Sequence, residues 1–221
     1  MKLADWTPRP RPAPDILQGA HARLERLDWT AHGAELFEAV AEPGIWTYMP
    51  DGPFPERASF EAEFEATRAA NGWETLIVRA ADGPVLGMAS YMRIREAHGS
   101  VEVGCVAFGP RLKRTRVATD AMYLMARHIF EDLGYRRYEW KCNNANIASR
   151  RAALRFGFRF EGVFRNDMVV KGANRDTAWY AMTDADWRVV RAAFEAWLSP
   201  TNFDADGRQL ASLSDFRSEV A

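Results

Sequence analysis

The sequence predicts a mixed α/β fold in which helices cover a single packed sheet. Segments with the apolar spacing of helices are interspersed with segments that alternate or run apolar like strands. Glycine, proline and Asp-Gly pairs mark the boundaries between them, and no internal repeat is visible. The chain has 221 residues, 48% of them hydrophobic, which is enough for one domain with a sizeable core.

The first elements of the predicted domain are a strand and two helices. Residues 22–28 alternate like a strand, and a helix with Thr30 as its cap follows and ends at Pro43 and Gly44. Residues 55–70 contain two phenylalanines four positions apart, which indicates a second helix. The loop between the helices is rich in aromatic and turn residues.

The rest of the domain alternates strands with helices. An Asp82-Gly83 pair predicts a hairpin, and a second reversal is expected at 172–174. The expected strands are 74–80, 85–94, 100–108, 135–142, 158–164, 167–172 and 176–182. The expected helices are 117–134, 149–156 and 184–198.

Two terminal segments differ in composition from the domain, which we place at residues 16–198. Residues 1–15 carry alternating prolines and form an extended, polyproline-like arm. Residues 199–221 are a polar tail, expected to pack over the domain or to extend toward a second subunit. The tail contains Asp204 and Asp206 in a calcium-loop-like run, but it lacks the closing Glu at the required spacing.

Charge and cysteine content restrict the classes of partner. With 29 basic and 30 acidic residues the net charge is −1, which disfavours a nucleic-acid or membrane-surface protein. No segment resembles a signal peptide or a membrane span. Cys105 and Cys142 lie in apolar runs and are read as buried free thiols, so a cytoplasmic, reducing compartment is expected.

Residues 111–125, RLKRTRVATDAMYLM, place four basic side chains in six positions just before a helix. The first N–H groups of a helix lack partners within it, and the helix dipole favours an anion there. A compact anion such as a phosphate is therefore expected, and the alternative is a solvated turn that only caps the helix. A DNA-recognition helix is excluded because Met and Leu occupy its far face. The residues expected to bind the anion are Lys113, Arg114, Thr115, Arg116, Val117, Ala118 and Thr119.

Four segments together resemble the GNAT superfamily of N-acetyltransferases, in particular its Rim-type ribosomal-protein N-terminal acetyltransferases. They are VEVGCVAFGP, RLKRTRVATDAMYLM, YRRYEWKCNNANIASRRAALRFGFRFEGVFR and KGANRDTAWYAM. The resemblance covers about residues 16–198. It implies a mostly antiparallel twisted sheet that splays at the cofactor site, with helices on both faces. It also implies acetyl-coenzyme A (acetyl-CoA) as co-substrate and no metal.

In this family the basic turn holds the pyrophosphate of acetyl-CoA with the pattern Q/R-x-x-G-x-G/A. The resemblance places Lys113, Arg116 and Ala118 at the three patterned positions, so that Arg116 replaces a glycine. It also implies that Asn146 hydrogen-bonds the pantetheine arm and that Ser149 lies near the thioester sulfur. From chemistry alone, Asn146 and Ser149 could equally form a turn and a helix cap.

The strand at 100–108 gains a role from the same resemblance, because in this fold it diverges from the next strand. Its free backbone groups can then pair with pantetheine like an added strand. The backbone of Val106 and Phe108 is expected to make these contacts. Gly104 and Gly109 are the expected sites of the irregularity that the divergence requires.

The implied reaction is direct transfer of acetyl from the thioester to an amine, with no covalent enzyme intermediate. Glu102 is the first candidate for the general base, although it could be an ordinary strand carboxylate. Asp176 and Glu139 are weaker candidates. Many relatives have a tyrosine acid at the position of Ala153, so the role of general acid is assigned to Ser149.

The acceptor is the least constrained part of the prediction. Candidate contacts come from the loop between the first two helices and from one late strand, although such aromatics commonly serve packing. They are Trp46, Tyr48, Asp51, Phe54 and Trp179. The acceptor is expected to be a protein N-terminal amine or a small-molecule amine, and a homodimer is the expected assembly. The alternative function is a non-catalytic acyl-CoA-binding or sensing domain.

Overall fold

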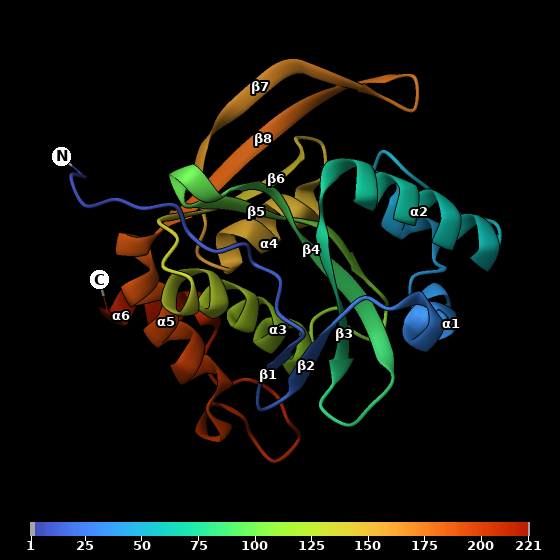
Figure 1. Cartoon of the computed structure of the whole chain (residues 1–221). Coiled ribbons are helices and arrows are strands. Elements are labelled where there is room, and N and C mark those ends of the chain that lie inside the picture. Colours follow the sequence, from blue (N-terminus) through green and yellow to red (C-terminus); the bar gives the residue numbers. More distant parts are fainter. Residues whose placement is uncertain (1–2, 221) are drawn as a thin grey trace.

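The computed structural model describes residues 3–220, and residues 1–2 and 221, the ends of the predicted arm and tail, lie outside the described residues. One eight-stranded sheet forms the centre of the molecule, in the order β1-β2-β3-β4-β5-β6-β8-β7 (Figure 1). All neighbouring strands are antiparallel except β5 and β6. The predicted mixed α/β, mostly antiparallel fold is confirmed.

The strands and helices follow one another in a mixed order. The strands are β1 (Ile16–Gln18), β2 (Ala22–Arg26), β3 (Glu74–Ala80), β4 (Val85–Arg95), β5 (Ser100–Phe108), β6 (Arg137–Asn143), β7 (Arg159–Val170) and β8 (Ala173–Thr183). The α-helices are α1 (Trp29–Ala39), α2 (Arg57–Asn71), α3 (Arg116–Arg127), α4 (Ile147–Arg155), α5 (Asp184–Leu198) and α6 (Leu213–Val220). Short helical turns are η1 (Pro43–Trp46), η2 (Glu96–His98), η3 (His128–Asp132) and η4 (Pro200–Asn202). Within the described chain, no helix is both long and apolar enough to cross a membrane.

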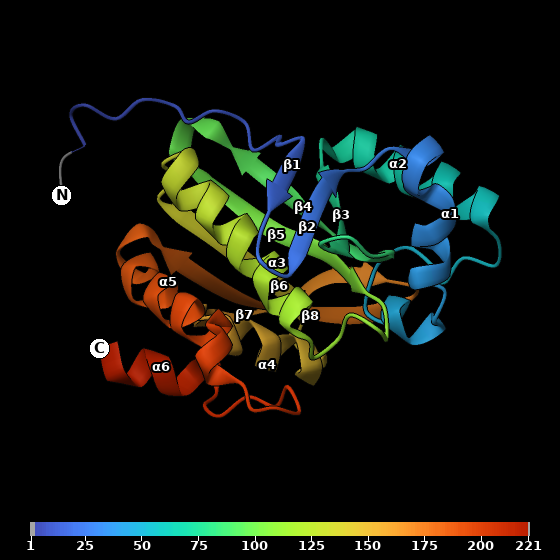
Figure 2. The same cartoon turned by 90° about the horizontal axis from the view of Figure 1, so that it is seen from below.

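Helices cover both faces of the sheet, as predicted (Figure 2). The larger core joins one face to α3 and α5 and includes Val101 and Val103 of β5. The smaller core joins the opposite face to α1 and α2 and includes Met88 of β4 and Ala107 of β5. Because side chains alternate along a strand, Glu102 faces the α1–α2 side.

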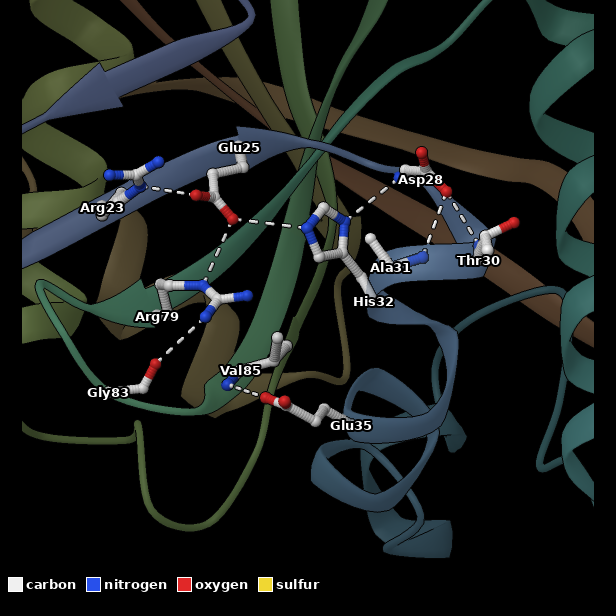
Figure 3. Close-up of polar contacts among 10 residues, drawn as sticks. All are labelled: Arg23, Glu25, Asp28, Thr30, Ala31, His32, Glu35, Arg79, Gly83 and Val85. Atoms are coloured by element: carbon white, nitrogen blue, oxygen red, sulfur yellow. Dashed lines mark hydrogen bonds and ion pairs between the residues drawn. The ribbon is translucent and has the colours of Figure 1, made fainter.

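The start of α1 differs from the predicted one. Asp28, not Thr30, caps the helix, and its carboxylate accepts the N–H groups of Thr30 and Ala31 (Figure 3). Asp and Thr are both good caps, and the position is decided by β2 ending two residues earlier. The helix also ends before the predicted Pro43, at Ala39, and a 3₁₀ turn follows.

A polar cluster joins α1 to the sheet (Figure 3). The Glu25 carboxylate of β2 pairs with Arg23 at 2.5 Å and with Arg79 of β3 at 3.3 Å. His32 of α1 accepts the N–H of Asp28 at Nδ1, so the ring proton lies on Nε2, 3.3 Å from Glu25 Oε2. In this buried His32 the Nε2 contact joins α1 to β2, and the Nδ1 contact holds Asp28, the cap of α1.

The hairpin of β7 and β8 also corrects the prediction. The two short strands expected at 158–164 and 167–172 are one strand, with a register shift where Asn166 adopts φ 51°. The chain reverses at Lys171-Gly172, and residues 173–174 already belong to β8. Lys171 donates to the carbonyls of Trp46 (2.8 Å) and Asp51 (3.2 Å), so the tip of the hairpin lies on the α1–α2 connection (Figure 1).

Both terminal segments contact the domain. In the arm, Trp6 donates to the carbonyl of Ala97, and the Pro10 carbonyl accepts the hydroxyl of Tyr135. The predicted polar tail contains α6, whose Leu213 is buried, and Arg217 donates to the carbonyl of Arg155. The tail therefore packs over the domain, which is the first of the two arrangements expected for it.

Asp120 of α3 connects this helix to the β1–β2 turn and gives a prediction for stability. Its buried carboxylate accepts the N–H groups of His21 (2.7 Å) and Ala22 (2.9 Å). Asp120→Ala leaves both donors without partners, which costs about 2–4 kcal/mol. The expected fall in the thermal midpoint is roughly 5–10 °C. Both N–H groups meet the same atom, Oδ2, so the amide oxygen of Asp120→Asn can replace it and this variant should lose less than Asp120→Ala. Equal midpoints for Asp120→Ala and the parent protein would contradict this role.

Candidate active site

The sheet opens between β5 and β6. Their parallel pairing extends only over Ser100–Val103 and Arg137–Trp140. Beyond this point β5 continues along β4 to Phe108, and β6 continues along β8 to Asn143. The two strands therefore diverge, as the predicted splay requires, and leave a gap in the middle of the sheet.

A β-bulge on β5 lies at the start of this gap. Cys105 and Val106 together oppose one residue of β4, and Cys105 adopts a φ of 45°. The irregularity thus falls one residue after Gly104, one of its two expected sites. Gly109 donates to the carbonyl of Leu86 on β4. Because N–H groups alternate in direction along a strand, those of Phe108 and Val106 point away from β4, into the gap.

The basic turn connects the end of β5 to α3. Thr115 caps α3 by accepting the N–H of Ala118 at 3.1 Å. Arg114, just before it, adopts the left-handed conformation with φ 64°. Within residues 3–220, no acceptor is found for the backbone N–H groups of residues 114–117. Four backbone donors are thus gathered at the positive end of the helix.

The basic side chains of the turn differ in how they are engaged. Lys113 lies 3.5 Å from Glu42, and both side chains are about half exposed. Arg114 is exposed, and no carboxylate of the described residues pairs with it. The Arg116 guanidinium lies 4.1 Å from the ring centroid of Phe203 and therefore contacts the tail. Thr119 is 2% exposed, and its hydroxyl bonds within the protein.

Asn146 and Ser149 lie on the opposite edge of the gap, at the start of α4. The Asn146 side chain caps α4 by accepting the N–H of Ser149 at 3.0 Å, so the helix begins two residues before the predicted start. Trp140 of β6 donates its indole N–H to the Ser149 hydroxyl at 3.0 Å. Ala153, a residue of α4, is fully buried. The hydroxyl of Ser149 thus lies beside the last residue of β6 that still pairs with β5.

Glu102 occupies the other face of the sheet, and it is 3% exposed. Its Oε2 atom lies 3.1 Å from Lys141 Nζ and 3.7 Å from Arg93 Nε. Burial raises the pKa of Glu102, and the Lys141 and Arg93 charges oppose this effect. A carboxylate with a raised pKa beside a gap in the sheet has the properties of a general base.

The two weaker base candidates lie in different surroundings. Glu139 is buried and accepts hydrogen bonds from Arg95 (2.7 Å) and Arg137 (2.6 Å). Hydrogen bonds from the Asn166 N–H and the Asn174 side chain lower the pKa of Asp176. In each carboxylate one oxygen, Oε1 of Glu139 and Oδ1 of Asp176, accepts two hydrogen bonds, and Glu102, with its raised pKa, stays the first candidate for the base.

The predicted acceptor contacts fall into two groups. Trp46 and Phe54 are buried in the smaller core and meet edge to face with ring centroids 4.9 Å apart, which is the packing alternative. Tyr48, Asp51 and Trp179 are partly exposed. Burial raises the pKa of Asp51.

Three cations of this region were not predicted, namely Arg93, Lys141 and Lys171. Arg93 and Lys141 lie 5.1 and 5.0 Å from the centre of the Trp179 ring. Lys171 lies at the tip of the hairpin. Their strand and turn positions are visible in the sequence, but the pairing of β4, β6 and β8 that brings them together is not.

The two cysteines are free. Burial raises the pKa of Cys105 to about 12 and also raises that of Cys142. Thiols with such pKa values are poor nucleophiles near neutral pH. Among the described residues there is also no group of three or more His, Cys, Asp or Glu side chains that could hold a metal ion.

A sheet that opens beside a donor-rich helix start, with strand backbone free in the opening, is the arrangement that the resemblance to the GNAT superfamily implies. Comparison with known proteins gives the family. The acetyltransferase (GNAT) domain family matches residues 23–159, so the chain belongs to the GNAT acetyltransferases. The prediction of this superfamily is confirmed.

Individual relatives agree with this assignment. The crystal structure of a GCN5-related N-acetyltransferase from Brucella melitensis shares 44% identity, covers 98% of this chain and 100% of its own, and has a TM-score of 0.93. A probable GNAT-family acetyltransferase from Chromobacterium violaceum shares 41% identity over 85% of this chain and 96% of its own, with a TM-score of 0.81. The uncharacterized N-acetyltransferase YnaD of Bacillus subtilis is 23% identical over 164 residues, which is 74% of this chain and 92% of YnaD.

Proposed function

We propose that the protein transfers acetyl from acetyl-CoA directly to a primary amine. The observation that carries the proposal is the gap between β5 and β6, which has a different set of groups on each face. Ser149 and the start of α3 lie on the face of the larger core, and Glu102 and Lys141 lie on the α1–α2 face. The coenzyme and the amine can therefore approach the gap from opposite faces.

The residues at the gap fit acetyl-CoA. The unpartnered N–H groups at 114–117, with Lys113 and Arg114 beside them, suit a pyrophosphate. The outward N–H groups of Val106 and Phe108 suit the amides of a pantetheine arm laid along β5. When bound, acetyl-CoA supplies an acetyl group activated as a thioester. A spermidine N-acetyltransferase from Vibrio cholerae, 15% identical, was solved with CoA, and this likeness shows the fold alone.

Glu102 and Lys141 prepare the amine. Amines are protonated near neutral pH, and a nearby cation such as Lys141 favours the neutral, nucleophilic form. When the neutral amine attacks the thioester, its nitrogen must lose one proton. Glu102 accepts this proton, directly or through one water, because burial raises the pKa of its carboxyl group. Asp176 and Glu139 stay the weaker candidates, since one oxygen of each already accepts two hydrogen bonds.

The β5 backbone and Ser149 stabilise the negative charge that develops on the thioester oxygen and on the leaving sulfur. The N–H of Val106, aimed into the gap, donates to the thioester oxygen as negative charge develops on it. The Ser149 hydroxyl, held by Trp140, can donate a proton to the leaving sulfur. Ala153 has no proton to give, and a thiolate is a tolerable leaving group with a free pKa of about 8.5.

The branch and the setting of the enzyme are also proposals. A putative ribosomal-protein-serine acetyltransferase from Vibrio cholerae shares the fold at 18% identity and a TM-score of 0.64, which leaves the Rim-type branch a proposal. The two free thiols favour a reducing compartment, and we propose the cytoplasm. The near-zero net charge argues against nucleic-acid or membrane partners, and the expected homodimer stays a separate proposal.

The test measures release of free CoA from acetyl-CoA in the presence of amino acids, short peptides and polyamines. Acetyl-CoA at about 100 times its Kd stabilises the protein by ~2.7 kcal/mol, which raises the thermal midpoint. The proposal requires both this rise and amine-dependent CoA release. A rise without release from any amine would favour the alternative, a non-catalytic acyl-CoA-binding or sensing domain.

A further inference from the structure

We propose that the acceptor amine also carries an anionic group, a carboxylate or a phosphate, and that Arg93 binds this group. The inference rests on the proposed function and adds the class of acceptor. Arg93 belongs to none of the sequence motifs that indicate the family, and three features of its surroundings carry the inference.

The first feature is the local balance of charge. Glu102 is one carboxylate facing two cations, Lys141 and Arg93. The neighbouring cluster is balanced, because Glu139 and Glu161 share Arg95 and Arg137.

The solvent exposure of the two side chains shows which cation is free to bind a ligand. The side chain of Lys141 is 17% exposed and lies 3.1 Å from Glu102, whereas that of Arg93 is 45% exposed and lies 3.7 Å away. Arg93 therefore has donors open to a ligand on the acceptor face.

The second feature is the backbone of β4. Residues 93 and 94 oppose one residue of β5 in a bulge, and Arg93 adopts a left-handed φ of 45°. A bulge redirects a side chain, and strained non-glycine conformations concentrate at functional sites. Cys105 on β5 has the same φ of 45°, so Glu102 lies between two strained bulges on adjacent strands.

The third feature is an aromatic surface beside Arg93. Arg93 lies over Trp179 of β8, and the ring of Phe164 on β7 lies 5.0 Å from that of Trp179. The buried indole N–H of Trp179 has no acceptor within residues 3–220. Phe164 is 55% exposed. The site thus offers a cation, an aromatic surface and an unused donor beside the base.

This arrangement suits some amines and disfavours others. An acceptor whose anion contacts Arg93 can direct its amine toward Glu102 while its carbon chain lies on Trp179 and Phe164. A polyamine would bring further positive charges to a site with a surplus of cations, which is unfavourable.

The experiment compares kcat/KM for matched acceptors with and without the anion. The pairs are glycine and glycinamide, phenylalanine and phenylalaninamide, and O-phosphoethanolamine and ethanolamine, with spermidine as a cationic probe. The anion preference is the ratio of kcat/KM within a pair. Comparing this ratio between parent protein and variant cancels the different basicities of the two amines.

We expect Arg93→Gln to lower the ratio by about ten- to hundredfold, the range for a lost hydrogen bond to a charged group. The matched control is Arg95→Gln, two residues further along β4 and paired with Glu139, which should leave the ratio within about threefold. Comparison of the carboxylate and phosphate pairs identifies the anion.

An unchanged ratio in Arg93→Gln with continued turnover would overturn the inference and leave the proposed function intact. A parent protein that prefers spermidine would also overturn it. Absence of CoA release with every amine, despite stabilisation by acetyl-CoA, would instead contradict the proposed function.

Discussion

Glu102→Gln should lower kcat by about 10²–10⁴-fold, the range that general acid–base catalysis contributes. The substitution keeps the shape of the side chain but removes the atom that accepts the proton. Steady-state CoA release at saturating acetyl-CoA and amine measures the effect. The KM for acetyl-CoA should change little, because Glu102 lies on the face opposite the start of α3.

The matched control is Glu139→Gln on the neighbouring strand. Glu102 and Glu139 are register partners in β5 and β6 and are 3% and 2% exposed. Both also pair with basic side chains. If burial and ion pairing alone explained the loss, the two variants would lose similar activity. A base role predicts that the loss at Glu102 exceeds the loss at Glu139 by at least about tenfold.

The pH dependence of kcat/KM distinguishes a base from a residue with a structural role only, because a purely structural role of Glu102 would leave this dependence unchanged. Burial raises the pKa of Glu102 and the Lys141 charge lowers it, so kcat/KM should fall with decreasing pH at a value above the ordinary carboxyl pKa of 4.5. Lys141→Met removes the lowering effect and should move this acid limb to higher pH. In Glu102→Gln this fall of kcat/KM at acidic pH should disappear. If it persisted in the variant, a group other than Glu102 would be responsible for it.

Local rules were sufficient for most elements of the fold. The predicted helix 184–198 is α5 residue for residue, because Thr183 and Asp186 form a capping box at its start. The Asp82-Gly83 hairpin between β3 and β4 is likewise confirmed. The three-residue β1 is too short for a periodic pattern, and α6 was hidden in a polar tail whose apolar face is small.

The candidate site was less predictable, because it depends on backbone conformations that its residue types do not indicate. Cys105 and Arg93 are not residues that favour a positive φ, so the bulge at Arg93 leaves no mark in the sequence and the bulge on β5 is indicated only by the neighbouring Gly104. The pairing of β4, β5, β6 and β8 decides which basic side chains lie against the Trp179 ring. Family resemblance does not supply this information, since Arg93 lies outside the motifs that carry it.

Arg114→Gly should weaken binding of acetyl-CoA by about ten- to hundredfold, with little change in the stability of the free protein. Arg114 is exposed in the basic turn, and removing its side chain deletes a charged hydrogen bond to a phosphate, a loss of about 1.5–3 kcal/mol. Its left-handed φ of 64° costs a non-glycine residue about 1–2 kcal/mol. Glycine relieves that cost, and its greater loss of chain entropy, about 0.5–1 kcal/mol, offsets part of the gain.

The two effects are separable by measuring Kd calorimetrically and the thermal midpoint without ligand. Lys171→Gly is the matched control. Lys171 is also a basic residue with a left-handed backbone conformation, φ 50°, but it lies at the tip of the β7–β8 hairpin. A similar loss of coenzyme affinity in both variants would show that the effect is unspecific. Thr119 is a poor probe, since its buried hydroxyl bonds to Arg155 and a charge placed there would disturb the fold. A selective loss in Arg114→Gly, with a midpoint that is equal or slightly higher, would show that the turn's cations serve the coenzyme rather than the fold.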